Sequence, residues 1–242
     1  MSARNRIGWH QAVAKNLTAS LLVLVATGCQ APQTAEEATT YSTPAPASSP
    51  VIEPAPLELV ELIDGAQQIA AAVTAVPTDL QEGSAVWGYS EGGELVPIRR
   101  GTNHITCLAD DPSDERFQVA CYHDSLEPFM ARGRALKAEG VKGPDRMQMR
   151  HDEIEAGTLA LPLKPTTVYS FGGDIEIYDS ATGLVDLEAG SHVYAIYTPY
   201  ATEASTGLST TPPIRGAPWI MRPGTPSAHI MIVPPKVAAA NN

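Results

Sequence analysis

The sequence lacks a run of apolar residues long enough to form a permanent membrane helix. Its longest mainly apolar run, from Leu17 to Ala26, holds about ten residues, whereas a spanning helix needs about 20. The sequence also lacks the H-E-x-x-H of zinc proteases, the C-x-x-C-H of haem attachment and a glycine loop that would cradle phosphate before a helix. No reaction class is therefore indicated, and we expect neither a metal ion nor an organic cofactor.

Basic residues are also scarce. Lysine and arginine number 16 against 27 aspartate and glutamate residues, which gives a net charge of −11. Arg4, Arg6 and Lys15 lie in the first 28 positions, so the rest of the chain has 13 basic and 27 acidic residues, a net charge of −14. Such a surface repels nucleic acid and anionic lipid headgroups, so we expect no nucleic-acid partner. It favours solubility and cationic partners.

The N-terminus has the pattern of a bacterial lipoprotein signal peptide, which we assign to residues 1–28. Basic residues precede the apolar run, and the run ends in Ala26-Thr27-Gly28-Cys29, which is typical of a lipobox. Cleavage before Cys29 and acylation of its thiol would anchor the protein to a membrane. Gln30 rather than Asp follows the cysteine, which in a Gram-negative cell favours the outer membrane. The alternative is an ordinary cleaved signal with a chance cysteine at its edge.

Composition divides the remaining chain into two parts. Residues 29–56 are mostly Ala, Pro, Thr, Ser and Glu, which predicts a disordered tether that holds the folded part away from the membrane. Residues 57–242 are long enough to bury a sizeable core, and we expect a single globular domain there.

Two cysteines remain once the lipid-bearing Cys29 is set aside. In an oxidising compartment, Cys107 and Cys121 are expected to form a disulfide. The alternative is a tetrahedral zinc site in which these two cysteines join His104 and His123.

Apolar spacing predicts two or three helices. The first spans Leu59 to Val73 and is stopped by Pro77. The second follows Cys121, with Asp124 as its N-cap and Glu127 completing a capping box. A shorter helix is expected at residues 145–156.

Short strands are predicted between and after these helices. Residues 85–89 and 94–98 flank Glu91-Gly92-Gly93 and indicate a hairpin, in which Pro97 places the second strand at an edge. A Gly172-Gly173 turn is expected between two further strands, on the second of which Asp174, Glu176 and Tyr178 share one face. The later strands are predicted at residues 167–171, 174–178, 192–197 and 228–233. The fold class is therefore α+β, with a mainly antiparallel sheet of short strands.

Three segments of the chain resemble a family of bacterial exported proteins that is known only as uncharacterised. They are RRGTNHITC (Arg99 to Cys107), YTPYATEASTGLS (Tyr197 to Ser209) and GAPWIMRPGTPSAHIMIVP (Gly216 to Pro234). The resemblance spans roughly the whole folded part. Relatives carry Asn-Gly-Trp-Thr-Cys where this chain has Asn-His-Ile-Thr-Cys, which argues against a family-wide role for His104. The resemblance implies an intact exported domain and no particular reaction.

His192 and His229 are the leading candidates for a site. Each stands at the start of an apolar strand-like run. If those strands pair, the two imidazoles could meet at one end of the sheet and, with Asp124, Asp174 or Glu176, bind a metal or act as acid and base. The alternative is that each imidazole hydrogen-bonds a loop carbonyl and fixes a turn.

Three functions follow from these observations. The first is a non-catalytic envelope lipoprotein whose folded domain binds an unknown ligand or protein. The second is an envelope hydrolase or metal-dependent enzyme that uses His192 and His229. The third is a zinc-stabilised module built on the two Cys-His pairs.

Overall fold

The computed structural model describes residues 58–214 and 216–236. The signal peptide expected at residues 1–28, the lipid site at Cys29 and the tether expected at residues 29–56 lie outside the described residues. In the described part, no helix is long and apolar enough to cross a bilayer.

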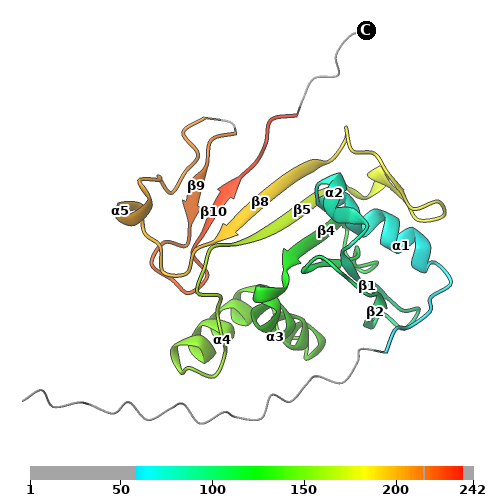
Figure 1. The fold of residues 1–242 in the computed structure, drawn as a ribbon, viewed down its shortest axis with the longest axis horizontal. Coiled ribbons are helices and arrows are strands. Elements are labelled where there is room, and N and C mark those ends of the chain that lie inside the picture. Colours follow the sequence, from blue (N-terminus) through cyan, green and yellow to red (C-terminus); the bar gives the residue numbers. More distant parts are fainter. Residues whose placement is uncertain (1–57, 215, 237–242) are drawn as a thin grey trace, which may run out of the picture. The chain divides into compact units, whose positions relative to one another are not determined.

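The described residues form an α+β fold around one eight-stranded sheet (Figure 1). The strand order is β2-β1-β3-β4-β5-β8-β10-β9, and every neighbouring pair is antiparallel except β1 with β3. The bounds are β1 Ala85–Tyr89, β2 Leu95–Arg99, β3 Ile105–Leu108, β4 Arg116–His123, β5 Thr166–Asp174, β8 Ser191–Tyr197, β9 Trp219–Met221 and β10 His229–Ile232. A second, two-stranded sheet pairs β6 (Tyr178–Asp179) with β7 (Leu184–Val185). The predicted fold class is thereby confirmed.

The described residues contain five α-helices, and three of them are longer than a single turn. These three are α1 (Gly65–Ala72), α3 (Glu127–Ala138) and α4 (Gly143–Glu155). The single-turn helices are α2 (Thr78–Gln81) and α5 (Glu203–Thr206), and the short 3-10 helices are η1 (Val73–Ala75), η2 (Asp124–Leu126) and η3 (Ile175–Ile177).

The larger core lies on one face of the sheet, which we call the α1 face. Alternation along β4 turns Phe117, Val119 and Cys121 toward this face, where they are fully buried. Phe171 of β5 joins them, and the alanine-rich α1 together with η1 covers the cluster. Burial of this apolar surface is the main force that holds α1 and η1 on the sheet.

The opposite face, which we call the α3 face, has a smaller core. Tyr122 and Val168, which are register partners on β4 and β5, pack there beneath Leu126 and Met130. Because this cluster is small, much of the α3 face farther along β5, β8 and β10 is only partly buried.

The β1–β2 hairpin is present as predicted, and β2 is an edge strand in agreement with the position of Pro97. The first helix, however, begins at Gly65 and not at Leu59. Residues 58–62 form no regular element, Ile63 and Asp64 form a turn, and the N–H of Val60 donates to the carbonyl of Pro97 at 2.9 Å. A backbone contact with the edge strand has replaced the first helical turns that the apolar spacing predicted.

The expected capping box after Cys121 is also wrong. His123 is the N-cap, and its Nδ1 accepts from the N–H of Ser125 at 3.1 Å. Glu127 instead accepts hydrogen bonds from Tyr122 and Arg134, each at 2.5 Å. Glu127 therefore binds the charged side chain of Arg134, two turns along α3, and not the backbone N–H that a capping box would use.

The Gly172-Gly173 pair is not a turn. β5 runs through both glycines to Asp174, and a Cβ on Gly172 would lie 2.9 Å from the carbonyl oxygen of Phe117. These glycines therefore allow close strand pairing. Because η3 follows β5, Asp174 and Glu176 do not share the strand face that was expected.

Cys107 and Cys121 are direct register partners on β3 and β4, and their sulfur atoms lie at the bonded distance of 2.07 Å. This confirms the predicted disulfide and leaves no thiolate for the alternative zinc site with His104 and His123.

Candidate functional site: an acidic pocket lined by tyrosines

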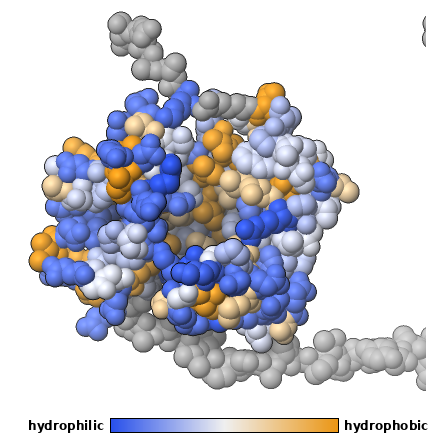
Figure 2. All heavy atoms as spheres, turned by 180° about the vertical axis from the view of Figure 1, so that it is seen from behind, coloured by the Kyte–Doolittle hydropathy of each residue, from blue (hydrophilic) through white to orange (hydrophobic). Residues whose placement is uncertain are grey.

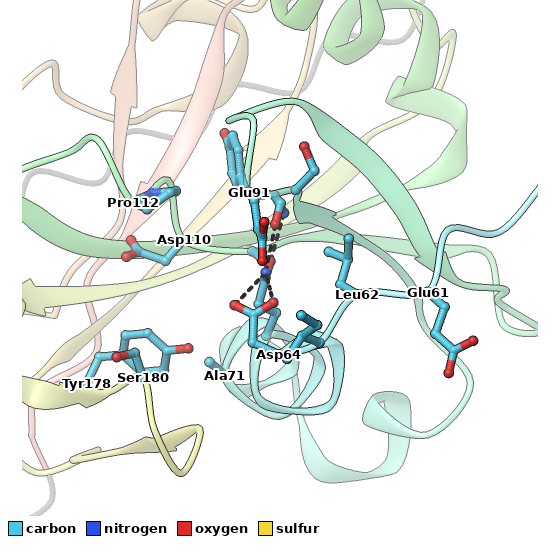
Figure 3. Close-up of a pocket in the computed structure, with 14 residues that line it drawn as sticks. Glu61, Leu62, Asp64, Ala71, Glu91, Asp110, Pro112, Tyr178 and Ser180 are labelled. Atoms are coloured by element: carbon cyan, nitrogen blue, oxygen red, sulfur yellow. Dashed lines mark hydrogen bonds between the residues drawn. The ribbon is translucent and has the colours of Figure 1, made fainter.

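A pocket of about 680 Å³ lies where four segments meet: the start of α1, the β1–β2 turn, the loop after β3, and β6 (Figure 3). Its size falls within the usual range for small-molecule sites, about 300 to 1,000 Å³. The polar lining side chains are Glu61, Asp64, Gln68, Tyr89, Ser90, Glu91, Asp110, Tyr178 and Ser180. Leu62, Ile63, Ala71, Ala109 and Pro112 supply the apolar part.

The charge of this lining has one sign. Four carboxylic side chains, Glu61, Asp64, Glu91 and Asp110, line the pocket, and none of its lining residues is Lys, Arg or His. In Figure 3, Asp64 and Asp110 enter the pocket from different elements. A ligand between them would therefore meet negative charge from more than one direction.

Asp64 is oriented by the side-chain amide of Gln68. Nε2 of Gln68 lies 3.0 Å from each carboxylate oxygen of Asp64, and it also donates to the carbonyl of Tyr89 at 2.9 Å. The N–H of Tyr89 donates to Oε1 of Gln68 at 2.7 Å. Gly88 makes room for this arrangement, because a Cβ there would lie 2.6 Å from Oε1 of Gln68. The amide thus fixes the position of the carboxylate relative to β1.

Asp110 is partly buried in the opposite wall. Burial raises the pKa of Asp110 to about 6, and the nearby charges of Asp114 and Asp111 raise it further, against a hydrogen bond from the N–H of Gln118 at 2.7 Å. The negative charge of the pocket therefore increases as pH rises through the weakly acidic range, because Asp110 loses its proton.

The pKa of the next residue, Asp111, is lowered and not raised. Burial raises its pKa, but hydrogen bonds from Lys137 and Ser113 outweigh that effect and bring the pKa of Asp111 to about 2. Asp111 remains ionised at all ordinary pH values and keeps negative charge close to Asp110.

The negative charges around the pocket also raise the pKa values of the two lining tyrosines, Tyr89 and Tyr178, in addition to the larger effect of burial. Burial raises the pKa of Tyr89, and the charge of Asp111 and a hydrogen bond to it act in the same direction. Burial also raises the pKa of Tyr178, followed by the charges of Asp64, Asp110 and Asp179. Both phenols are neutral, so their rings offer the negative π-face that attracts ammonium and guanidinium groups.

The lining is not arranged as a site for a bare metal ion. Within residues 58–214 and 216–236, no group of three or more His, Cys, Asp or Glu side chains converges closely enough to hold one. The carboxylates are spread around a wide pocket and fit a larger cation better than a single ion that needs six to eight oxygens.

Ser90 belongs to a segment, Gly88 to Gly92, that satisfies the G-x-S-x-G pattern of hydrolase nucleophile elbows. Such an elbow needs a strand followed by a helix, but here the serine lies in the turn between β1 and β2. Its hydroxyl accepts from the N–H of Glu94 at 3.2 Å, and no histidine lines the pocket. The serine stabilises a turn.

His192 and His229 do not come together. Their strands pair, but the register partner of His229 is Tyr197, five residues along β8 from His192. That separation is about 16 Å along a strand, and an odd offset places the two side chains on opposite faces. Nε2 of His192 donates to the carbonyl of Thr74 in η1 at 3.2 Å, which ties η1 to the sheet. The hypothesis of one site built on both histidines is therefore wrong.

Asp124 lies with neither of these histidines. Its carboxylate contacts Nδ1 of His104 at 2.7 Å and Nδ1 of His123 at 3.2 Å. The imidazole of His104 is 74% exposed, and the backbone of this residue has a φ of 61°. This surface cluster fixes the β3–β4 end of the sheet to the start of η2, and His123 also lines an open pocket of about 570 Å³ together with Ser125 and Thr166.

Comparisons with known proteins give no assignment for this arrangement. No protein-family model matches the chain, and no curated protein or solved structure matches it significantly.

Proposed function

We propose that the folded part is the non-catalytic binding domain of a lipid-anchored envelope protein, and that its ligand is an organic cation held in the acidic pocket. One observation carries this proposal: four carboxylic side chains and two tyrosines line the pocket, and no lining side chain is basic. Carboxylates and aromatic faces together are the usual partners of ammonium groups in proteins.

The apolar part of the lining favours an organic cation over an inorganic one. Leu62 and Ile63 directly precede Asp64 in the chain and line the same pocket, and Ile63 is 94% exposed. A ligand with hydrocarbon between its charges would cover this exposed surface while its ammonium groups meet the carboxylates. A linear aliphatic polyamine combines both features.

The anchor belongs to the same proposal. A lipid on Cys29 and a proline-rich tether at residues 29–56 would hold the pocket outside the cytoplasm, at some distance from the membrane. The net charge of −14 outside the signal segment would raise the local concentration of cations around the protein.

Isothermal titration calorimetry of the full-length protein with spermidine tests the proposal. We expect spermidine to bind and triethylene glycol, a neutral chain of comparable length, not to bind. Asp64→Asn should weaken spermidine binding about tenfold, which corresponds to about 1.4 kcal/mol. Asp79→Asn is the matched control, because it removes the same charge from α2, outside the pocket. Equal spermidine affinity for the wild type and Asp64→Asn would refute the proposal.

A further inference from the structure

Two large apolar side chains stand out from the described surface because they are almost completely exposed. Leu163, in the loop between α4 and β5, is fully exposed, and Ile63, at the acidic pocket, is 94% exposed. Figure 2 shows one face of the molecule, on which hydrophilic residues cover most of the surface and apolar residues are confined to smaller areas. One exposed apolar side chain needs no explanation. These two differ from that ordinary case because charged residues of opposite sign lie next to them.

The charge next to Leu163 is positive. Lys164 follows it directly and is exposed, and within residues 58–214 and 216–236 its ammonium group has no ion pair. Pro162 and Pro165 flank the two residues and restrict their backbone, which lowers the entropy lost when such a loop binds. The loop lines the open pocket of about 570 Å³ at the β3–β4 end of the sheet, and none of the lining residues there is acidic.

The charge next to Ile63 is negative. Asp64 follows Ile63 directly and lines the acidic pocket. A carboxylate has about four positions that accept hydrogen bonds, so the contact of its two oxygens with Nε2 of Gln68 leaves room for a further donor. The two segments therefore have the same order, an exposed apolar side chain and then a charged one, with charges of opposite sign.

The loop and the acidic pocket lie at opposite ends of the sheet. β1, β3 and β5 run in the same direction, because β1 is parallel to β3 and both β3 and β5 are antiparallel to β4. The loop precedes β5, whereas the pocket is lined by the last residue of β1, by residues after β3 and by β6, which follows β5. β5 has nine residues and is about 30 Å long. Lys164 therefore cannot reach Asp64 of its own chain.

We propose that copies of this protein bind one another head to tail, with Leu163 and Lys164 of one copy in the acidic pocket of the next. The ammonium group would meet Asp64 while Leu163 covers Ile63, so one contact accounts for both exposed apolar side chains. The inference rests on the proposed function, because it assigns to the same pocket an organic cation that belongs to the protein itself.

A head-to-tail contact leaves a free loop on one copy and a free pocket on the other, so further copies can add. Two side chains in one pocket make a small contact, which is weak between proteins in dilute solution. Attachment of the copies to one membrane through Cys29 would raise their local concentration and favour the contact.

Disulfide trapping in intact cells, after addition of a membrane-permeant oxidant, tests this inference. One copy carries Ile63→Cys and a second, differently tagged copy carries Leu163→Cys, because a disulfide requires Cβ atoms about 4 Å apart. We expect a dimer that contains both tags. Lys164→Gln in the second copy should reduce its yield about fivefold, as expected for the loss of one exposed ion pair. Lys142→Gln, which removes a charge at the start of α4, should leave the yield unchanged.

Two further variants define the contact. Asp64→Asn in the Ile63→Cys copy should reduce the yield as Lys164→Gln does. Ile214→Cys is the control for exposure, because Ile214 is 72% exposed and precedes β9 at the other edge of the sheet, and it should not be trapped by Leu163→Cys. No dimer with both tags, or an equal yield from Ile214→Cys, would overturn the inference. A larger yield of dimers between two Leu163→Cys copies would indicate a symmetric contact and overturn it as well.

Calorimetry with spermidine separates this inference from the proposed function. Lys164→Gln should bind spermidine at least as strongly as the wild type, because the pocket then has no competing lysine. Spermidine binding without a trapped mixed dimer would overturn the inference and leave the proposed function intact. A mixed dimer that depends on Asp64 and Lys164, in a protein that does not bind spermidine, would support the inference and overturn the proposed ligand.

Discussion

Gln68 and Tyr89 are joined by two hydrogen bonds although they lie 21 residues apart: Nε2 of Gln68 donates to the carbonyl of Tyr89 at 2.9 Å, and the N–H of Tyr89 donates to Oε1 at 2.7 Å. The side-chain amide thus pairs with the end of β1 as another strand would. Because Nε2 also contacts Asp64, the same amide connects the stability of the α1–β1 contact to the shape of the acidic pocket.

Gln68→Met should lower the free energy of unfolding by about 1 to 3 kcal/mol, because it leaves both backbone groups of Tyr89 without their partner. Urea unfolding measures this change. Gln67→Met is the matched control. Oε1 of Gln67 is buried without a hydrogen-bond partner among the described residues, so its removal should leave stability unchanged or higher. Equal losses in the two variants would contradict the role assigned to Gln68.

Asp110 should make stability depend on pH in a defined direction. Its pKa of about 6 in the folded protein exceeds the ordinary value of 3.8, so the folded state holds this proton more tightly than the unfolded state. The contribution of Asp110 to stability is greatest below pH 4 and decreases as pH rises to about 6, with no further change above that value. Asp110→Asn should remove this decrease, as measured by urea unfolding across the pH range.

The same carboxyl group should control the binding of a cation. Spermidine affinity is expected to increase as pH rises from about 5 to about 7, because Asp110 becomes negatively charged over this interval. Calorimetry at several pH values should show a smaller increase for Asp110→Asn. If spermidine affinity depended on pH in the same way in both proteins, Asp110 would not contribute to spermidine binding.

Cys29→Ser should release the protein from the membrane fraction. The thiol of Cys29 is the proposed lipid acceptor, and without acyl chains the acidic folded part has no membrane affinity of its own. Cell fractionation and labelling with radioactive palmitate test this expectation, with Cys107→Ser as a cysteine control. Continued palmitate labelling of the Cys29→Ser protein would contradict the proposed anchor.

Local signals in the sequence predicted the elements that depend on neighbouring residues. The β1–β2 hairpin follows from its glycines, and the edge position of β2 follows from Pro97. The disulfide between Cys107 and Cys121 follows from export and an even count of cysteines. The parallel pairing of β1 with β3 carries no local signal, and no strand was predicted at the residues of β3.

The register between strands determines whether the predicted site residues lie close together. Pairing of the strands that carry His192 and His229 was considered, but register alone determines whether the side chains meet, and it places them on opposite faces. The acidic pocket was missed because Asp64, Tyr89 and Asp110 belong to separate elements. No site was predicted at the aspartates after β3, and the high negative charge was the one signal that pointed toward a cationic ligand.

An NMR titration of the full-length protein with spermidine tests the central claim most directly, because it locates the ligand as well as detecting it. The account predicts shifts of the side-chain amide of Gln68 and of the backbone amides of Tyr89 and Asp110, with little change in α3 and α4. Shifts confined to residues outside the acidic pocket, or no shifts at millimolar spermidine, would contradict it.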